Sequence, residues 1–265
     1  MKRKKQLEGK IALITGASQG QGKAEARLFV ERGARVILAD INEKKGVKLQ
    51  KELGASAEFF KLNVASEEDW KELIKNIKAT FHHLNVLICN AGISPAPKNI
   101  ENLKLEEYLK VVNTNQIGTF LAIKSSLSLL KKAKTASIIT ISSTAGLNGV
   151  TGLAPYASSK FAIRALTKVA SLELGQYGIR VNSILPGPID TEMLRPEGGW
   201  GIDMRKALAN SNPLGRIGTP TDIAEMAAFL ASDASSFCNG ADFVVDGGIL
   251  AGTFSPPDST DPWEV

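Results

Sequence analysis

Short apolar segments alternate along the chain with longer stretches in which apolar residues recur at helical spacing. The apolar segments, rich in β-branched residues, predict strands at 11–15, 35–39, 58–62, 84–89, 136–141, 179–184 and 242–245. The stretches between them predict helices at 21–32, 43–53, 67–80, 103–131 with a break near 113, 155–176 and 221–231. Because the strands are apolar throughout, both faces of the sheet should be covered. We expect an α/β fold with a doubly wound, mainly parallel, seven-stranded sheet and helices on both faces.

Polar and glycine-rich segments follow the predicted strands and do not precede them. In a doubly wound sheet, ligands bind at the carboxyl ends of the strands. The polar and glycine-rich residues that follow six of the strands should therefore lie at one edge of the sheet. They are Thr15–Gly22, Asp40, Asn63, Asn90-Ala91-Gly92, Ser142-Ser143 and Pro186-Gly187-Pro188.

The chain has 265 residues, of which 43% are hydrophobic, and no Pro/Gly/Ser-rich linker interrupts its middle. We expect one domain over 7–253, preceded by a basic, disordered tail at 1–6 and followed by a loosely held tail at 254–265. The net charge is +5, but the Lys/Arg residues at 2–5 supply four of the 32 basic residues, leaving 28 against 27 acidic ones. The near-neutral body and the absence of interleaved aromatic residues favour a solubilising tail over an arm that binds nucleic acid or a membrane surface.

No apolar segment suited to a secretory signal follows the basic start, and no apolar run is long enough to span a membrane. The two cysteines, Cys89 and Cys238, lie far apart in sequence and are interpreted as plain thiols. We therefore expect a cytoplasmic protein with neither a membrane nor a nucleic-acid partner.

The segment "TGASQGQG" (15–22) directly follows the first predicted strand. Its three glycines let the backbone turn tightly and approach a pyrophosphate, and the next helix offers unpaired N–H groups. The alternative is a glycine-rich turn that binds no ligand. Asp40 ends the second strand 24 positions after Gly16, where a carboxylate can accept hydrogen bonds from the adenosine ribose. It favours NAD(H) over NADP(H), unless it is an ordinary strand-end aspartate that begins a turn.

Tyr156 and Lys160 lie four residues apart at the start of a predicted helix, and Ser143 lies 13 residues before the tyrosine. At this spacing the phenol and the ammonium share one helix face, and we expect the ammonium to lower the pKa of the phenol. Such a pair suits acid–base work on an alcohol, with Ser143 bonded to the substrate oxygen. Taken alone, such a pair is more often an exposed helix face.

The order and spacing of five motifs resemble those of the short-chain dehydrogenase/reductase family over residues 7–253. The motifs are Thr15-Gly16-x3-Gly20-x-Gly22, Asn90-Ala91-Gly92, Ser143, Tyr156-x3-Lys160 and Pro186-Gly187. The resemblance implies a Rossmann-type domain that interconverts a secondary alcohol and a ketone by hydride transfer. Within the family, "ARVILAD", "NAGIS", "SSTAGLNG" and the closing segment ending "GADFVVDGG" are most similar to NAD-linked hydroxysteroid dehydrogenases of the 3α/20β type.

The resemblance also implies the roles of the catalytic residues. Tyr156 is the general acid/base, Lys160 lowers its pKa and binds the nicotinamide ribose, and Ser143 orients the substrate oxygen. Asn115 holds a water for a proton relay. Asn113 competes with Asn115, and the distance to Gly118 favours Asn115; Ser142 competes with Ser143, and the spacing to Tyr156 favours Ser143.

The expected cofactor contacts extend along the strand ends. They are Gly16, Ser18, Gln19, Gly20, Gln21, Gly22, Asp40, Ile41, Asn63, Val64, Asn90, Ala91, Gly92, Tyr156, Lys160, Pro186, Gly187, Ile189 and Thr191. The chain departs from the family's usual residues at Gln21, Asn63 and Cys89, and none of these departures touches the transfer chemistry. Gln21 should change local packing beside a backbone contact, and Asn63 should still accept a hydrogen bond from adenine.

Substrate selection is expected in the segment 187–213, an apolar, glycine-hinged stretch that could close as a lid or simply pack onto the core as a surface loop. The expected substrate residues are Ser143, Tyr156, Leu153, Met193, Leu194, Trp200 and Met204, and 95–97 and 147–153 would form the opposite walls. A small hydrophobic alcohol or ketone, cyclic and steroid- or terpenoid-like, is the expected substrate.

Two alternatives remain at this point. A 3-oxoacyl thioester reductase of the same family would usually use NADPH, and the carboxylate of Asp40 argues against that cofactor. A catalytically idle NAD-binding sensor or scaffold would not need the intact set Ser143, Tyr156 and Lys160. No metal is expected, because His82-His83 has no cysteine or carboxylate partner at ligand spacing. The resemblance implies a homotetramer assembled through the helices at 103–131 and 155–176 and the "DGG" end.

Overall fold

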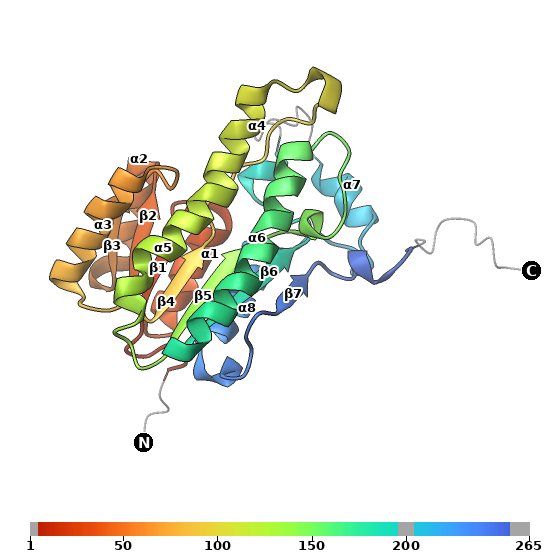
Figure 1. Cartoon of the computed structure of the whole chain (residues 1–265). Helices are drawn as coiled ribbons and strands as arrows, with labels where there is room; N and C mark the ends of the chain where they lie inside the picture. Colours follow the sequence, from red (N-terminus) through yellow and green to blue (C-terminus); the bar gives the residue numbers. More distant parts are fainter. Residues whose placement is uncertain (1–4, 196–203, 255–265) are drawn as a thin grey trace, which may run out of the picture.

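The computed structural model describes residues 5–195 and 204–254, and its centre is a seven-stranded sheet in the order β3-β2-β1-β4-β5-β6-β7 (Figure 1). Every pair of neighbouring strands is parallel. The strands are β1 (Ile11–Thr15), β2 (Arg35–Asp40), β3 (Ala57–Lys61), β4 (Val86–Cys89), β5 (Ala136–Ile141), β6 (Ile179–Pro186) and β7 (Asp242–Val245). The predicted fold class is confirmed, and the order reverses between β1 and β4, where doubly wound sheets bind their ligands.

Helices cover both faces of this sheet (Figure 1). One layer contains α1 and α8, which pack closely on each other, with α2 beside α1; the other contains α3, α5, α4 and α6. The helices are α1 (Gly20–Glu31), α2 (Glu43–Leu53), α3 (Glu67–Thr80), α4 (Leu105–Val112), α5 (Gly118–Leu130), α6 (Ala154–Leu174), α7 (Arg205–Asn210) and α8 (Pro220–Ala231).

The apolar strands supply the core on both sides at once. In β2, Val36 and Leu38 belong to the cluster under α1 and α8, whereas Ile37 between them belongs to the cluster under α3 and α5. Successive side chains of a strand point to opposite faces. A strand buried on both faces therefore has to be apolar at every position, as the sequence pattern indicated.

Two segments differ from the sequence-based expectation. The break expected near 113 is a five-residue π-helical stretch, Asn113–Ile117, between α4 and α5. Gly118 follows it, and a Cβ at this position would lie only 2.8 Å from Val64 Cγ2, so the start of α5 packs tightly against the loop after β3. The short helix α7 was not predicted, because six residues inside an irregular segment carry too little apolar periodicity.

Contacts at the amino-terminal end begin before residue 7. Lys5 Nζ donates to Glu31 O over 3.0 Å, and Arg32 donates to Gln6 Oε1. The expected boundary at Leu7, which is buried, thus lies inside a segment already attached to the end of α1. None of the helices that the structure describes is both long and apolar enough to cross a bilayer.

Candidate active site

The glycine-rich turn after β1 is packed too closely to admit side chains at two of its glycines. Gly16 has a φ of +64°, and a Cβ there would lie 2.8 Å from Ala91 Cα. A Cβ on Gly22 would lie 2.3 Å from Gly16 O. Asn90 Nδ2 donates to Thr15 O (3.0 Å) and Gly16 O (3.1 Å), which fixes the turn to the end of β4. The turn therefore brings bare backbone to the amino-terminal end of α1, as a pyrophosphate site requires.

Asp40 stands at the end of β2 beside this turn. Its Oδ2 accepts a hydrogen bond from Ser18 N (3.0 Å), and its Oδ1 accepts one from Asn42 N (2.8 Å). The carboxylate is buried, while its neighbour Ile41 is largely exposed. Each carboxylate oxygen keeps a second lone pair, so Asp40 both shapes the turn and can still accept from a ribose hydroxyl.

A small cavity of about 170 Å³ opens between the turn and α2. Ser18 Oγ is buried there and has no hydrogen-bond partner within residues 5–195 and 204–254. Lys45 Nζ donates to Gln19 Oε1 across the cavity. Its lining residues are Ser18, Gln19, Lys23, Lys45, Lys48, Leu49, Glu52 and Glu192.

On the other side of the turn, Asn63 has a different local role from the one expected. Its Oδ1 accepts from Ala65 N (3.1 Å) and its own N donates to Asp69 Oδ2 (2.9 Å), so the exposed side chain stabilises the loop before α3. Val64 is buried beside Gly118, and its carbonyl accepts from Trp70 Nε1 (2.9 Å). The side-chain Nδ2 of Asn63 can still donate a hydrogen bond, and its Oδ1 already accepts one from Ala65 N.

The segment after β6 completes the edge of the site. Pro186 ends the strand, and a Cβ on Gly187 would lie 2.8 Å from Asp246 Cα. Ile189 is buried and forms a parallel bridge with Gly218. Thr191 lies beside the glycine turn, since a Cβ on Gly20 would be 3.3 Å from Thr191 Cγ2. The structure thus brings the predicted residues of 186–191 to the same edge as residues 15–22.

Tyr156, Lys160 and Ser143 converge at the carboxyl end of β5. Ser143 caps the short 3₁₀ turn Thr144–Gly146, and its Oγ accepts from Ala145 N over 3.1 Å. Tyr156 and Lys160 lie in the first two turns of α6, and Pro155 is the second residue of this helix. Lys160 Nζ lies 5.5 Å from the centroid of the Tyr156 ring and donates to Ile141 O over 2.8 Å.

The electrostatics of this cluster correct one expectation. Burial raises the pKa of Tyr156, and the hydrogen bond with Ser143 acts in the opposite direction. Burial also lowers the pKa of Lys160 from 10.5 to about 8. The expected lowering of the pKa of the phenol is therefore wrong as a net effect, because burial outweighs the contribution that lowers it. Lys160 is buried and Tyr156 is partly buried, and removal from water favours the uncharged form of each, while the ammonium is directed to the Ile141 carbonyl.

The structure gives different environments to Asn115 and Asn113, the two candidates for the catalytic asparagine. Asn115, fully buried in the π-helical stretch, accepts from Ile93 N (2.8 Å) and donates from Nδ2 to Ile93 O (3.0 Å) and Ser159 Oγ (3.1 Å). Asn113 is exposed. A Cβ on Gly92 would lie 3.4 Å from Asn115 Oδ1 and 3.5 Å from Lys160 Nζ, so the asparagine oxygen and the lysine nitrogen both lie next to the same point beside Gly92.

Ser142 has a different environment from its neighbour Ser143. Its hydroxyl is buried and donates to Lys160 O over 2.8 Å, inside α6. This bond attaches the end of β5 to the helix that carries Tyr156. Of the two serines, Ser143 is the one bonded to the tyrosine side chain.

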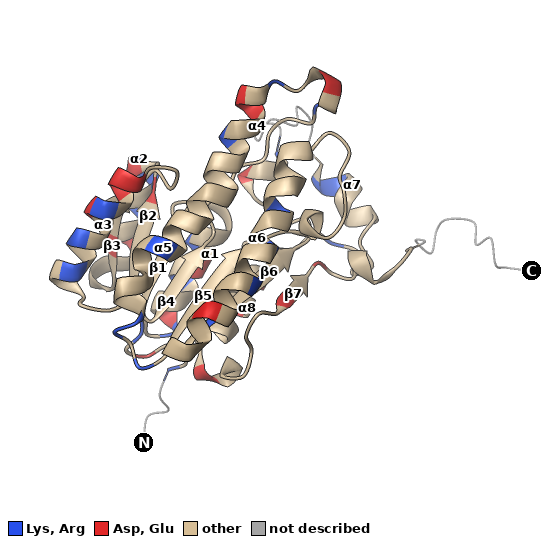
Figure 2. Cartoon of the chain, in the orientation of Figure 1, with Lys and Arg blue, Asp and Glu red and all other residues tan. Residues whose placement is uncertain are grey.

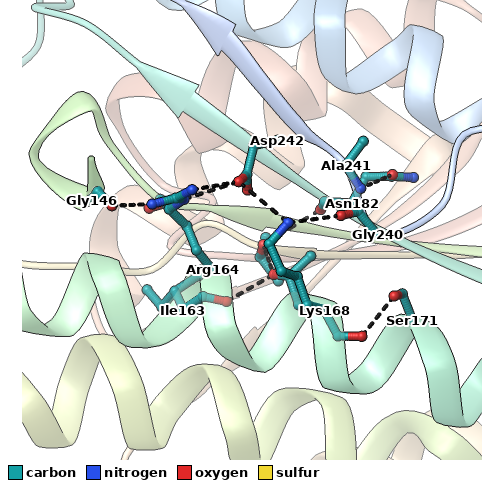
Figure 3. A network of polar contacts seen from close by, with 12 residues as sticks. Gly146, Ile163, Arg164, Lys168, Ser171, Asn182, Gly240, Ala241 and Asp242 are labelled. Atoms are coloured by element: carbon teal, nitrogen blue, oxygen red, sulfur yellow. Dashed lines mark hydrogen bonds and ion pairs between the residues drawn. The ribbon is translucent and has the colours of Figure 1, made fainter.

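Sequence reasoning missed Arg164, which lies one turn beyond Lys160 on α6. Its guanidinium donates to Gly146 O (2.7 Å) and, through two nitrogens, to Asp242 Oδ2 (3.0 and 2.8 Å) at the start of β7 (Figure 3). Lys168 adds a 3.6 Å ion pair to the same carboxylate. The network ties α6 to β7 and to the turn after Ser143. The spacing Tyr156, Lys160, Arg164 along one helix face could have indicated it.

The expected substrate residues are spread over three segments. Leu153 is buried at the start of α6. Met193 and Leu194 form part of the 3₁₀ turn Glu192–Leu194, and Met204 N donates to Leu194 O over 3.5 Å. Trp200 lies outside the described residues. Within the described parts of 187–213, Thr191 thus lies next to the glycine turn, and residues 205–210 form α7.

No group of three or more potential metal ligands occurs in the parts of the chain that the structure describes. His82 follows the end of α3, is exposed and has a φ of +61°. Cys89 is buried in β4 and burial raises the pKa of its thiol far above neutrality, so this departure from the family pattern packs as an apolar residue.

The chain belongs to the short-chain dehydrogenase/reductase family. The family model that matches it, over residues 16–250, is described as enoyl-(acyl carrier protein) reductase. The chain is 38% identical to a 3-alpha-(or 20-beta)-hydroxysteroid dehydrogenase of Mycobacterium tuberculosis, over 93% of this chain and 91% of the relative.

It is also 38% identical to a 2,5-dichloro-2,5-cyclohexadiene-1,4-diol dehydrogenase of Sphingobium indicum, over 93% of this chain and 98% of the relative. A mitochondrial borneol dehydrogenase of Lavandula x intermedia is 37% identical, over 92% of each chain. The chain is therefore an oxidoreductase of a family whose dehydrogenases use nicotinamide cofactors.

Proposed function

We propose that the protein is an NAD(H)-dependent dehydrogenase that interconverts a secondary alcohol and a ketone on a small, hydrophobic, cyclic substrate. The observation that carries the proposal is the convergence of Ser143, Tyr156 and Lys160 at the strand ends that also hold the glycine turn. A hydroxyl, a phenol and an amine in one partly buried cluster suit proton transfer to or from an alcohol oxygen.

Tyr156 is the general acid/base in this proposal. For ketone reduction the neutral phenol gives its proton to the oxygen, and its raised pKa keeps that proton available at neutral pH. For alcohol oxidation the phenolate has to form, and a protonated Lys160 nearby favours it. Ser143, bonded to the tyrosine side chain, holds the substrate oxygen in line. A bound nicotinamide ring supplies the hydride donor or acceptor.

Asn115 acts as a positioning residue for Lys160. Its side chain is fixed by three hydrogen bonds, and its oxygen and the ammonium of Lys160 both lie next to the same point beside Gly92. With a pKa of about 8, Lys160 exchanges its proton near neutral pH. A relay from solvent to Tyr156 through a water beside Asn115 and Lys160 therefore has its protein groups in place.

A dinucleotide fits the residues present. The closely packed glycines at 16 and 22 and the unpartnered, buried Ser18 Oγ form a cradle that side chains do not fill. The backbone amides at the start of α1 and the end of β6 would hold the pyrophosphate and nicotinamide halves. Residues proposed to hold the cofactor are those from Gly16 to Gly22, with Asp40, Ile41, Asn63, Val64, Asn90, Ala91, Gly92, Tyr156, Lys160, Pro186, Gly187, Ile189 and Thr191.

Asp40 favours NAD(H) over NADP(H), because a buried carboxylate repels a 2′-phosphate. Lys23, Lys45 and Lys48 around the neighbouring cavity act in the opposite direction. Lys45 and Lys48 are solvent-exposed, and salt screens exposed charges more than a buried one. We therefore expect the carboxylate to determine the preference.

The names of the three relatives support a cyclic alcohol, since a hydroxysteroid, a cyclohexadiene diol and borneol all contain a carbon ring. The apolar Leu153, Met193, Leu194 and Met204, with Trp200, are proposed to contact it. The description of the family model, an acyl-carrier reductase, keeps a 3-oxoacyl thioester as the second candidate.

We propose a cytoplasmic homotetramer assembled through α4, α5 and α6. These helices leave large apolar side chains in contact with solvent, including Phe120, Phe161, Val169 and Leu172, the last 83% exposed. Figure 2 shows the charged residues gathered on α2 and α3, with few on α5 and α6. A face of this kind is typical of subunit interfaces. Both cysteines are free thiols, as in reducing compartments.

The test is a screen of cyclic secondary alcohols, cyclic ketones and a 3-oxoacyl thioester, followed at the nicotinamide absorbance with NADH/NAD⁺ and with NADPH/NADP⁺. We expect turnover with at least one cyclic alcohol or ketone and a preference for the NAD couple. Turnover of the thioester alone would replace the proposed substrate class. A strong preference for NADPH would contradict the role given to Asp40.

A further inference from the structure

Helix α1 contains a fully buried glutamic acid, Glu25, that has no part in the catalytic cluster. Within the described part of the chain, neither of its carboxyl oxygens has a hydrogen-bond partner. Burial raises its pKa from 4.5 to about 8. At neutral pH the group therefore holds its proton, and it is a hydrogen-bond donor and not a charge.

Gln21 lies one helical turn before Glu25. Residues four apart share a helix face, so the two side chains are neighbours. Gln21 Oε1 is also buried and without a partner among the residues that the structure describes. A protonated Glu25 can donate to this oxygen, which satisfies the donor and the acceptor together. An ionised Glu25 would instead place acceptors against each other in a dry environment.

Gln21 belongs to the glycine turn itself, between Gly20 and Gly22. A Cβ on Gly22 would lie only 2.3 Å from Gly16 O, so the first turn of α1 packs directly against the backbone of this turn. Glu25 is five residues, or roughly 8 Å, along the helix from its first residue. A charge on Glu25 would therefore act on whatever anion the amino-terminal end of α1 holds.

Among the described residues, no charged group facing α1 offsets such a charge. Helix α1 packs mainly on α8, β2, β1 and α2, and burial alone accounts for the shift in the pKa of Glu25. Asp222 pairs with Arg216, Glu225 with Arg32, and Glu52 with Arg27, while Asp40 accepts from Ser18 N. The charged residues on α1 and these elements are Lys23, Arg27, Glu31, Arg35, Asp40, Glu43, Lys44, Lys45, Lys48, Lys51, Glu52, Asp222 and Glu225.

We propose that Gln21 and Glu25 form a positioning pair whose shared proton controls how tightly the glycine turn binds the pyrophosphate of the dinucleotide. The proposal rests on the proposed nicotinamide cofactor. With the proton present, the pair is neutral and hydrogen-bonded, and it holds the first turn of α1 in place. When the proton leaves, a buried negative charge repels the pyrophosphate, and Glu25 can no longer donate to Gln21 Oε1.

The test measures the Kd of NADH by fluorescence titration between about pH 6.5 and about pH 9.5. The proteins are the wild type, Glu25→Gln, and Glu31→Gln as an exposed control on the same helix. Because Lys160 also titrates near pH 8, the readout is the Kd of the wild type divided by the Kd of Glu25→Gln at each pH. Unit charges about 10 Å apart at an effective dielectric constant of about 20 predict that this ratio rises by roughly 15-fold once Glu25 is fully ionised. Glu31→Gln should follow the wild type.

A ratio that stays constant across the pH range overturns the proposal. A Glu25→Leu variant gives the same comparison if Glu25→Gln does not fold. The infrared band of a protonated carboxylic acid should disappear above about pH 8 in the wild type and be missing from Glu25→Gln. If NADH bound to no variant at any pH, the proposed function would fail. The infrared measurement would still show whether Glu25 carries a proton at a given pH.

Discussion

The substitution Glu25→Gln should change the stability of the protein in a strongly pH-dependent way. In the folded chain Glu25 holds its proton up to about pH 8, whereas an unburied glutamic acid releases it near 4.5. The folded state therefore binds more protons between these values. Its stability is highest below the unfolded pKa and falls as the pH rises towards the folded pKa.

The size of the effect follows from the shift. One pKa unit corresponds to about 1.36 kcal/mol, so a rise from about pH 5 to about pH 8 should cost the wild type about 4 kcal/mol through this one group. The glutamine side chain of the Glu25→Gln variant does not ionise and is nearly the same size. Relative to the wild type, the variant should therefore gain about 4 kcal/mol over this range, with about 3 kcal/mol of it present by pH 7.

Urea unfolding at one protein concentration, at several pH values across this window, measures the difference. Glu31→Gln, exposed on the same helix, is the control for the loss of one carboxyl. Parallel stability curves for the wild type and Glu25→Gln, with a difference that changes by less than about 1 kcal/mol, would show that Glu25 is already ionised in the folded protein.

Three further predictions concern the turn, the cofactor and the network around α6. Gly22→Ala should abolish NADH binding in a fluorescence titration, because the new Cβ would meet Gly16 O at 2.3 Å; normal affinity would contradict the packing of the turn. Asp40→Asn keeps an acceptor for Ser18 N but removes the charge, so the ratio of kcat/KM for NADP⁺ to that for NAD⁺ should rise about tenfold. Arg164→Met leaves the partly buried Asp242 with the longer 3.6 Å contact to Lys168, and urea unfolding should show a loss of about 2 kcal/mol that the double variant Arg164→Met/Asp242→Leu recovers in part.

The parts of the fold that follow from periodicity could be predicted from the sequence. All seven strands and the main helices lie within a few residues of their expected positions, because an apolar run buried on both faces leaves a clear pattern. Helix α7 could not be found in this way, since its six residues give less than two turns of pattern. The π-helical stretch was foreseen only as a break, because its geometry depends on how Gly118 packs against Val64.

The candidate site was predictable as a set of residues and less so as an electrostatic environment. Spacing brought Ser143, Tyr156 and Lys160 together, and the structure confirms that they converge. Spacing does not reveal burial, which reverses the expected shift in the pKa of Tyr156. Glu25 was missed for the same reason, because a glutamate in an amphipathic helix is usually exposed, and only the packing of α1 on α8 shows that this one is not.

The most direct test of the account is the effect of Tyr156→Phe on turnover and on cofactor binding, measured in the same preparation. Phenylalanine keeps the ring beside Lys160 and removes the proton-carrying hydroxyl. We predict that kcat/KM for the best cyclic alcohol or ketone falls by roughly 10²- to 10⁴-fold while the Kd of NADH changes less than about twofold. Substantial turnover by Tyr156→Phe, with NADH bound normally, would contradict the assignment of Tyr156 as the general acid/base.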